Sequence, residues 1–325
     1  MKNVVENPPM IQKFLSFSAE RHRVFLRRQK GLPQEEWTND LILQQNRFCN
    51  SYRVLDRGSQ FFIKDLLADQ PDQHTTLARA AMYRMTNEPK FWKLYISEVG
   101  LPSLEDMQDG TLESAMKWAH ETRRANIFRP SYTLSFGRES MGQKKHEIAP
   151  KHFFDHFHPE GSAYVGKQFF QANSMFGRMV ALEKAFRVGP FLAQQIVTDV
   201  NYSEHHLGNE NYRVVGGPGS RKGMQYLFGS EAAPQDYYNI QYMLLIQKLQ
   251  SALNVEPLEL PGGGERKLSL MDVQNCLCEF SKYVKLAGQV AKDPLKAAAS
   301  GKKFKPLKPL EIQLPAHWAN EVYNK

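Results

Sequence analysis

Residues 186–196 contain the residue types best suited to binding a nucleic-acid phosphate through the main chain. Gly189 permits a tight turn, and Pro190 suits the first position of the helix that follows. Backbone N–H groups at a helix start lack intrahelical partners, and the helix dipole makes them attractive to anions. The segment predicts the turn and second helix of a helix-hairpin-helix, with phosphate contacts at Arg187 and Gly189. Arg187 stands where such hairpins usually have a first glycine, and an ordinary corner between core helices is the alternative.

A glycine-rich run at residues 215–223 is a second anion-binding candidate. Its glycines let the backbone approach an anion closely, its serine is placed to cap a helix, and its two basic residues add positive charge. The residues assigned to this phosphate or diphosphate site are Gly217, Gly219, Ser220, Arg221 and Lys222. The spacing is not that of a nucleotide-triphosphate-binding loop. A structural turn with two solvated basic side chains is the alternative.

Two carboxylates flank this run. Asp199 lies at the end of the hairpin's second helix, and Glu210 follows in a polar loop. Helix-hairpin-helix base-excision enzymes place a carboxylate downstream of the hairpin, where it stabilises positive charge or activates a nucleophile. Both residues are therefore candidate catalytic groups. A helix-end or loop carboxylate that pairs with a nearby arginine is the alternative for each.

Residues 37–57 are dense in arginine, asparagine and aromatic side chains. Arginines bind phosphates, and aromatic rings stack on unpaired bases. The candidates are Arg47, Arg53 and Arg57 for phosphate contacts and Trp37 and Phe48 for base stacking. The alternative is a buried network of ion pairs, with Asp40 and Asp56, that holds helices together.

The composition is compatible with a polyanionic partner. The chain has 325 residues, enough to bury a full core, and a formal net charge of +8. Basic residues cluster in two segments, residues 21–30 and 302–308. Sparse cysteines and the lack of an apolar run or signal peptide predict a soluble protein of the cytoplasm, with no membrane partner. His152 and His156 could share a helix face and bind a metal, but the phenylalanines around them favour burial, so no metal site is assigned.

Helical patterns dominate the elements that must position these residues. Expected helices cover residues 10–29, 41–48, 56–68, 75–85, 90–97, 111–123, 174–185, 222–228, 236–253 and 268–286. Residues 127–163 have the least regular pattern, residues 132–136 and 213–215 are expected as short strands, and residues 257–266 as a flexible connection. We expect a single helical domain over residues 1–300, with the hairpin at about 174–200, and an extended basic tail rich in Lys and Pro over residues 301–325.

Taken together, these segments resemble the phage DNA-hypermodification proteins called α-glutamyl/putrescinyl-thymine pyrophosphorylases, which are amino acid:DNA or amine:DNA transferases. Relatives include the helical domain attached to hydroxymethyl-deoxyuridine DNA kinases. The resemblance spans most of the chain outside residues 70–161, in fixed order. Its motifs are Trp37-Thr38-x-Asp40, Asn46-Arg47-Phe48-Cys49-Asn50-x-Tyr52-Arg53-x-x-Asp56-Arg57, Val188-Gly189-Pro190-Phe191-Leu192-Ala193, Gly217-Pro218-Gly219-Ser220-Arg221-Lys222-Gly223 and Leu270-Met271-Asp272-Val273-Gln274-Asn275-Cys276-Leu277-Cys278-Glu279-Phe280.

The resemblance implies a mainly α fold related to helix-hairpin-helix DNA glycosylases, with few short strands. It also implies that an amine displaces pyrophosphate from 5-pyrophosphoryloxymethyl-deoxyuridine in double-stranded DNA, with the base flipped out of the duplex. The amine would be an amino acid, such as glycine or glutamate, or a polyamine. A carboxylate, Asp199, Glu210 or Asp40, would take its proton. The run at 217–222 would stabilise the leaving group, and Arg53 or Arg57 would hold an amino acid's carboxylate.

Two other functions remain open on the sequence. One is a DNA glycosylase, although the residues after Gly189 lack the active-site lysine of that class. The other is a non-catalytic DNA-binding partner of a DNA base kinase. No cofactor is assigned, and a divalent metal ion that assists pyrophosphate departure remains an option.

Overall fold

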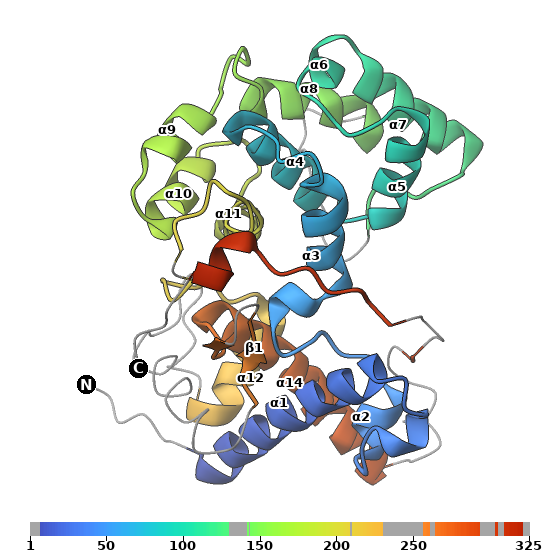
Figure 1. Cartoon of the computed structure of the whole chain (residues 1–325), viewed down its shortest axis with the longest axis vertical. Helices are drawn as coiled ribbons and strands as arrows, with labels where there is room; N and C mark the ends of the chain where they lie inside the picture. Colours follow the sequence, from blue (N-terminus) through green and yellow to red (C-terminus); the bar gives the residue numbers. More distant parts are fainter. Residues whose placement is uncertain are drawn as a thin grey trace. The chain divides into compact units, whose positions relative to one another are not determined.

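The computed structural model describes residues 7–129, 142, 144–208, 210–229, 256–260, 264–292, 303–304 and 309–320. These residues are mainly helical, as the sequence predicts, and their only strands are two pairs of residues (Figure 1). The chain forms two compact units. Unit 1 comprises residues 1–57, 209–314 and 318–325, and unit 2 comprises residues 58–208 and 315–317. No helix within the described ranges is both long and apolar enough to span a membrane.

Unit 1 is built on two long helices. Helix α1 (Pro8–Gln29) begins at the Asn7 cap, and α14 (Leu270–Lys292) carries the central apolar stripe of the unit. Phe14 of α1 meets Phe280 of α14 edge-on, with ring centroids 5.3 Å apart. Shorter elements complete the described part of the unit: η1 (Gln34–Glu36), α2 (Leu41–Gln45), η2 (Arg53–Leu55) and α12 (Pro218–Phe228).

Glycine allows α12 to approach α14 closely. A Cβ atom added at Gly223 would lie 2.3 Å from the carbonyl oxygen of Leu277, and one added at Gly219 would lie 2.7 Å from the Cys278 sulfur. Both separations are shorter than any real contact, so each position requires a hydrogen in place of a side chain. These two glycines of the glycine-rich run therefore serve helix packing.

Three expectations for unit 1 are wrong. Residues 213–215 form no strand, and α12 begins at Pro218 with Gly217 as its N-cap, so Ser220 lies inside the helix and does not cap it. The connection expected over 257–266 instead contains the antiparallel strands β1 (Leu258–Glu259) and β2 (Glu265–Arg266), in which Leu258 is paired with Arg266. The expected helix at 236–253 and the expected strand at 132–136 lie outside the described residues.

Unit 2 packs its helices around α4 (Gln73–Thr86), whose residues from Thr76 to Thr86 are all buried. Helix α4 begins at the Asp72 cap and contacts both α8 (Lys145–Phe157) and α11 (Pro190–Val200). The other helices are α3 (Arg57–Phe61, whose first residue belongs to unit 1), the π-helix η3 (Phe62–Leu66), α5 (Pro89–Glu98), α6 (Glu105–Gln108), α7 (Thr111–Thr122), α9 (Gly166–Gln171) and α10 (Met175–Leu182). A last short helix, η6, spans Ala316–Asn320 and is divided between the units.

Helix α8 overturns the expectation that residues 127–163 are irregular. It holds Pro150 in its interior, and its apolar side includes the fully buried Phe153 and Phe157. An interior proline destabilises a helix by about 3 kcal/mol. Burial of these two rings contributes a larger stabilising free energy. Tertiary packing here outweighs the local preference of the sequence.

Candidate nucleic-acid interface

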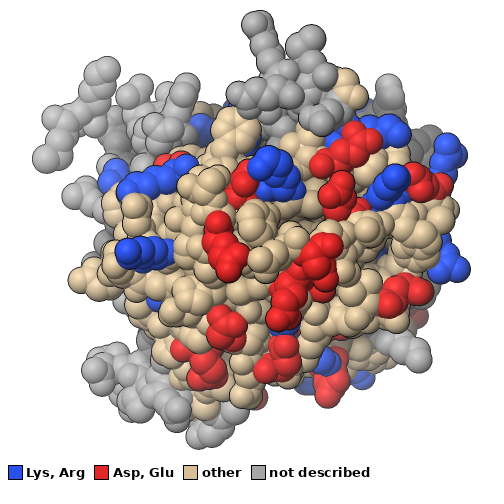
Figure 2. Space-filling view, turned by 90° about the horizontal axis from the view of Figure 1, so that it is seen from above, with Lys and Arg blue, Asp and Glu red and all other residues tan. Residues whose placement is uncertain are grey.

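The net positive charge of the chain is confined to one of the two units. Unit 2 contains equal numbers of basic and acidic residues, so the whole net charge of +8 belongs to unit 1. Figure 2 views the face formed by helices at the top of Figure 1, among them α6 and α8 of unit 2, and shows Asp and Glu side chains gathered across its middle. A polyanion is therefore attracted to unit 1 and not to that acidic face.

Unit 1 contains a cluster of arginines that repel one another. Burial, and then the positive charges of Arg21, Arg57 and Arg47, lower the pKa of Arg28 to about 10. Arg57 is affected in the same direction by partial burial and by Arg47, both of which lower its pKa. No described carboxylate forms an ion pair with Arg28 or Arg47. We call Arg28, Arg47 and Arg57 the arginine cluster.

Two aromatic rings flank Arg28. Its guanidinium carbon lies 5.0 Å from the ring centroid of Trp37 and 4.4 Å from that of Phe304, and the two rings meet edge-on. The Trp37 indole donates a hydrogen bond to the Leu32 carbonyl, and Arg27 donates one to the Trp37 carbonyl, which fixes the ring. Trp37 is half-buried, so part of its ring remains accessible. Guanidinium groups beside aromatic rings are the combination that binds phosphates next to stacked bases.

The basic tail also reaches the arginine cluster's side of unit 1. Lys303 pairs with Asn46 through an isolated β-bridge, and its ammonium donates to the Asn46 side chain. Sequence reasoning recognised the basic segments but did not assign Arg28, Lys303 or Phe304 to a site. The seven-residue spacing of Arg21 and Arg28, which puts both on one face of a helix, was the available signal.

Two residues predicted near this surface are buried. The Phe48 ring is 5% exposed and packs edge-on against Phe17, so it offers no face to a base. Arg53 is also 5% exposed, and its backbone N–H donates to the Asp272 carboxylate. By contrast, Arg47 and Arg57 are exposed at the surface.

A buried polar network holds this segment in place. Arg21 donates to the Phe48 carbonyl and to the Asn50 side chain, and the Asn50 N–H donates to Asp56. These contacts resemble the alternative drawn from the sequence, in which arginines and aspartates hold helices together. Here Arg21 belongs to the network, and the exposed Arg47 and Arg57 lie in the segment that the network holds in place.

The glycine-rich run occupies the start of α12. Gly217 is the N-cap, and the Ser220 hydroxyl donates to the Gly217 carbonyl and accepts from the Gln274 side chain. Ser220 is fully buried, Arg221 is half-buried, and Lys222 is exposed with its ammonium 5.1 Å from the Tyr226 ring centroid. The run thus presents Lys222 and Pro218 to solvent, and Gly217, Gly219 and Arg221 in part.

The predicted hairpin corresponds to α10, a turn and α11 in unit 2. Helix α10 contacts α11, and Gly189 is the exposed N-cap of α11. Arg187, which replaces the usual first glycine, has φ +65°, the left-handed conformation that glycine adopts readily. The backbone therefore makes a glycine-type turn with an arginine side chain on it.

The three candidate carboxylates have different environments. Asp199 is fully buried in unit 2 and accepts two hydrogen bonds from Arg84. Glu210 is buried in unit 1, where Arg266 donates to it over 2.7 Å and stacks on the Trp318 ring 3.6 Å away. Burial raises the pKa of Glu210, against the opposing attraction of Arg266.

Asp40 alone among the three is half-buried. One of its oxygens caps α2 by accepting from the N–H groups of Ile42 and Leu43. The other accepts from the Tyr283 hydroxyl over 2.6 Å. Burial and the Asp40 carboxylate both raise the pKa of Tyr283, which keeps that hydroxyl a donor at neutral pH.

The described residues contain no group of three or more His, Cys, Asp or Glu side chains arranged to bind a metal ion. His152 and His156 do lie together, with ring centroids 4.7 Å apart. Burial, followed by the charge of His156, lowers the pKa of His152 to about 4. His152 is therefore neutral at physiological pH.

Comparison with known proteins agrees with a role in DNA modification. The family model described as 5-hmdU DNA kinase, helical domain, matches residues 8–292. No curated protein and no solved structure matches the chain. Because the match covers most of the chain, including α1, the arginine cluster, both candidate phosphate-binding turns and α14, the chain belongs to the family of the 5-hmdU DNA kinase helical domain.

Proposed function

We propose that this protein binds double-stranded DNA chiefly through unit 1, with the hairpin turn of unit 2 as an additional contact, and takes part in converting a thymine-related base into a hypermodified one. The observation that carries the proposal is the arginine cluster, whose charges repel one another and have no acidic partner among the described residues at Arg28 and Arg47. The negative charge of a DNA phosphate bound among these guanidinium groups would offset their mutual repulsion. The family name refers to a kinase that acts on 5-hmdU in DNA, and we infer the thymine-related target base from that name.

The reaction we propose is transfer of an amine to an activated base. The substrate is 5-pyrophosphoryloxymethyl-deoxyuridine in DNA, and the amine is an amino acid or a polyamine. The neutral amine nitrogen bonds to the 5-methylene carbon while the bond from that carbon to oxygen breaks. Pyrophosphate leaves with the electron pair, and the new ammonium loses a proton to a base. Both charges need partners on the protein, a cation for the leaving group and a proton acceptor for the amine.

The arginine cluster is suited to the first task. Arginine forms paired hydrogen bonds with phosphate oxygens, and Arg28 is partly withdrawn from water, which strengthens its attraction for an anion. Trp37 beside it offers a ring on which a flipped base stacks. The basic residues Arg221 and Lys222 of α12 and the hairpin residues Arg187 and Gly189 are proposed as further DNA-backbone contacts.

Asp40 is the best-placed proton acceptor of the three candidate carboxylates. It lies in the same unit as the arginine cluster and is half-buried rather than sealed. Asp199 and Glu210 are each engaged with a buried arginine, so either would leave an unpaired charge behind if it moved to reach a substrate. We therefore assign proton transfer to Asp40, held in position by Tyr283.

The test measures pyrophosphate released from activated DNA by the purified full chain, with and without a mixture of amino acids and polyamines. Amine-dependent release, with a mass gain on the nucleoside, supports transfer. Asp40→Asn is expected to reduce turnover by about 100-fold, the usual range for general bases, while DNA affinity is unchanged. Asp40→Asn keeps the cap on α2, because asparagine caps helices as well as aspartate does.

Two results would contradict amine transfer, and a third would contradict only the role assigned to Asp40. Abasic sites in place of a new nucleoside indicate a glycosylase. Release of no pyrophosphate, combined with tight DNA binding, indicates a non-catalytic partner of the kinase. Full turnover by Asp40→Asn removes Asp40 from the mechanism and leaves the transfer reaction itself standing.

A further inference from the structure

Unit 2 contains a cavity of about 500 Å³ that the proposed function does not use. Its walls come from α5, from α7 and from the turn between α6 and α7. The volume is in the range of sites that enclose small organic molecules. We call it the α5–α7 cavity.

The walls of the α5–α7 cavity are aromatic and its charged groups are acidic. Phe91, Tyr95 and Trp118 contribute rings, and Glu98 and Asp109 contribute carboxylates at the rim. None of the described residues that line it is Lys, Arg or His. Aromatic faces together with carboxylates attract ammonium groups, whereas they repel phosphates. The cavity therefore suits an organic cation and is unsuited to DNA.

The Tyr95 hydroxyl faces a carboxylate that does not line the cavity. Tyr95 is 2% exposed, and Asp106 is the acidic group beside its hydroxyl. Burial, followed by the charge of Asp106 and a hydrogen bond to it, raises the pKa of Tyr95, so the hydroxyl stays protonated. Tyr95 therefore contributes its ring, and no negative charge, to the cavity wall.

The chain itself already places a cation at this rim. The Arg124 guanidinium lies 5.3 Å from the Trp118 ring centroid, and its nitrogen is 3.7 Å from a Glu98 carboxylate oxygen. Both charged side chains are about half exposed, and the separation is long for an ion pair. Such a pair contributes little to stability, so another cation can displace it. Arg124 thus marks the position that an ammonium group would occupy.

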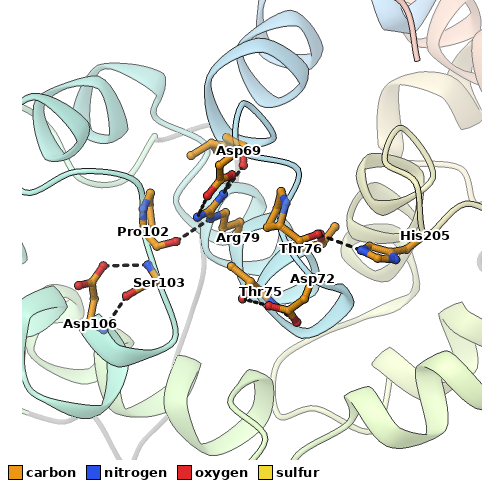
Figure 3. Close-up of polar contacts among 11 residues, drawn as sticks. Asp69, Asp72, Thr75, Thr76, Arg79, Pro102, Ser103, Asp106 and His205 are labelled. Carbon is orange, nitrogen blue, oxygen red and sulfur yellow. Dashed lines mark hydrogen bonds and ion pairs between the residues drawn. The ribbon is translucent and has the colours of Figure 1, made fainter. Parts of the chain in front are cut away.

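Helix α4 holds the segment between α5 and α6, which links Glu98 to Asp109 along the chain. Arg79 donates to the Pro102 carbonyl and forms paired hydrogen bonds with Asp69 (Figure 3). The next residues form a reciprocal cap, in which the Ser103 N–H donates to Asp106 and the Asp106 N–H donates to the Ser103 hydroxyl. These contacts limit the movement of the segment before a ligand arrives, and such preorganisation reduces the entropy lost on binding.

We propose that the α5–α7 cavity binds an aliphatic amine, with its ammonium group between Glu98, Asp109 and the Trp118 ring and its hydrocarbon chain against the apolar wall. The inference concerns binding alone. It holds whether or not the protein transfers an amine to DNA, and its test is done without DNA.

Calorimetric titration of the full chain with butylamine, butanol and butanoate tests the proposal. Butylamine is expected to bind, and the neutral and anionic analogues at least tenfold more weakly. Glu98→Gln and Asp109→Asn should each weaken butylamine binding by about tenfold, and Trp118→Leu by about fivefold. Asp109→Asn preserves the acceptor for the Thr111 N–H, so α7 keeps its start.

Two further variants are expected to strengthen butylamine binding or to leave it unchanged. Arg124→Gln frees Glu98 and removes a competing cation, so it should tighten butylamine binding by about threefold. Glu113→Gln removes the same charge from an exposed position on α7 that does not line the cavity, and it should leave binding unchanged. Circular dichroism of each variant checks that the fold is kept.

The outcomes separate cleanly. Absence of butylamine binding at millimolar concentration overturns the proposal. So does equal binding of butanol, which would indicate an apolar site, and so does equal weakening by Glu113→Gln, which would indicate general attraction to an acidic surface. Loss in the three lining variants with a gain in Arg124→Gln supports it.

Discussion

The carboxylate of Asp199 and the guanidinium of Arg84 form a two-bonded ion pair inside unit 2, and both groups are shielded from water. The pair joins α11, the second helix of the predicted hairpin, to the central helix α4. It explains why a carboxylate stands at the end of a helix that otherwise has an apolar character. The same contact argues for a structural role of Asp199.

Asp199→Asn should destabilise unit 2 strongly. The substitution leaves the Arg84 charge buried without its counter-ion, a change that typically costs about 3–5 kcal/mol. Urea denaturation followed by circular dichroism measures it. Asp155→Asn, which removes an exposed pair with Lys151 on α8, is the matched control and should cost less than about 0.5 kcal/mol. Equal costs for the two variants would contradict the structural role.

The arginine cluster should determine the salt dependence of DNA binding. Arg28→Gln and Arg47→Gln are each expected to reduce the slope of log affinity against log salt by about 0.9, because each phosphate contact releases counter-ions. Affinity should fall to a similar extent for different DNA sequences. Fluorescence anisotropy with labelled duplexes measures both quantities. Lys151→Gln in unit 2 is the control, and a comparable change in its slope would show that the attraction is not local.

Gly223→Ala should destabilise unit 1 because its new methyl group would overlap the Leu277 carbonyl. Overpacking of this kind costs about 1–3 kcal/mol. Gly288→Ala is an informative control, since it lies in the same unit on α14 with no atom within 4 Å. Alanine at that site should stabilise the helix by about 0.5–1 kcal/mol. Thermal unfolding of the two variants should therefore shift in opposite directions.

His22 should make unit 1 less stable in acid. Burial, and then the charges of Arg21 and Arg23, lower the pKa of His22 to about 4. The unfolded chain, with an ordinary histidine pKa near 6.5, binds this proton more readily than the folded chain does. The contribution of the neutral ring to the free energy of unfolding is therefore fully present above pH 6.5. It decreases by about 3 kcal/mol as the pH falls through the folded-state pKa near 4.

His22→Met tests this assignment, because methionine fills a similar volume and does not titrate. The difference in unfolding free energy between wild type and variant should narrow, or change sign in favour of the variant, between pH 6.5 and pH 4. A constant difference over that range would show that His22 is not the titrating group. Denaturant titrations at several pH values supply the comparison.

Local signals in the sequence predicted the elements that depend on local chemistry. Asp40 belongs to a residue type that favours helix caps, and it caps α2 by accepting from two N–H groups. The mainly helical class followed from the apolar spacing, whereas α8 was missed because Pro150 masked it. The glycines at 219 and 223 show a different limit, since the same residue type suits both an anion-binding loop and a close helix contact. Only the positions of Cys278 and Leu277 on α14, next to Gly219 and Gly223 respectively, identify the close helix contact.

The candidate site could be predicted only in part. Arg47, Arg57 and Trp37 were identified from their residue types, and they lie in the basic unit. The contact of Arg28 with Phe304 joins the two ends of the chain, and no spacing rule connects residues so far apart. Burial also removed two candidates, Phe48 and Arg53, that composition alone could not separate from exposed neighbours.

The left-handed backbone at Arg187 has a consequence for the residue type at this turn. A non-glycine residue in that region is less stable than glycine by about 1 kcal/mol, so folding alone favours glycine at the position. An arginine there keeps a guanidinium over the exposed Phe186 ring at the surface of the hairpin. Backbone stability and positive charge thus make opposite demands on this one residue: glycine would be more stable in the turn, and only arginine places a guanidinium at its surface.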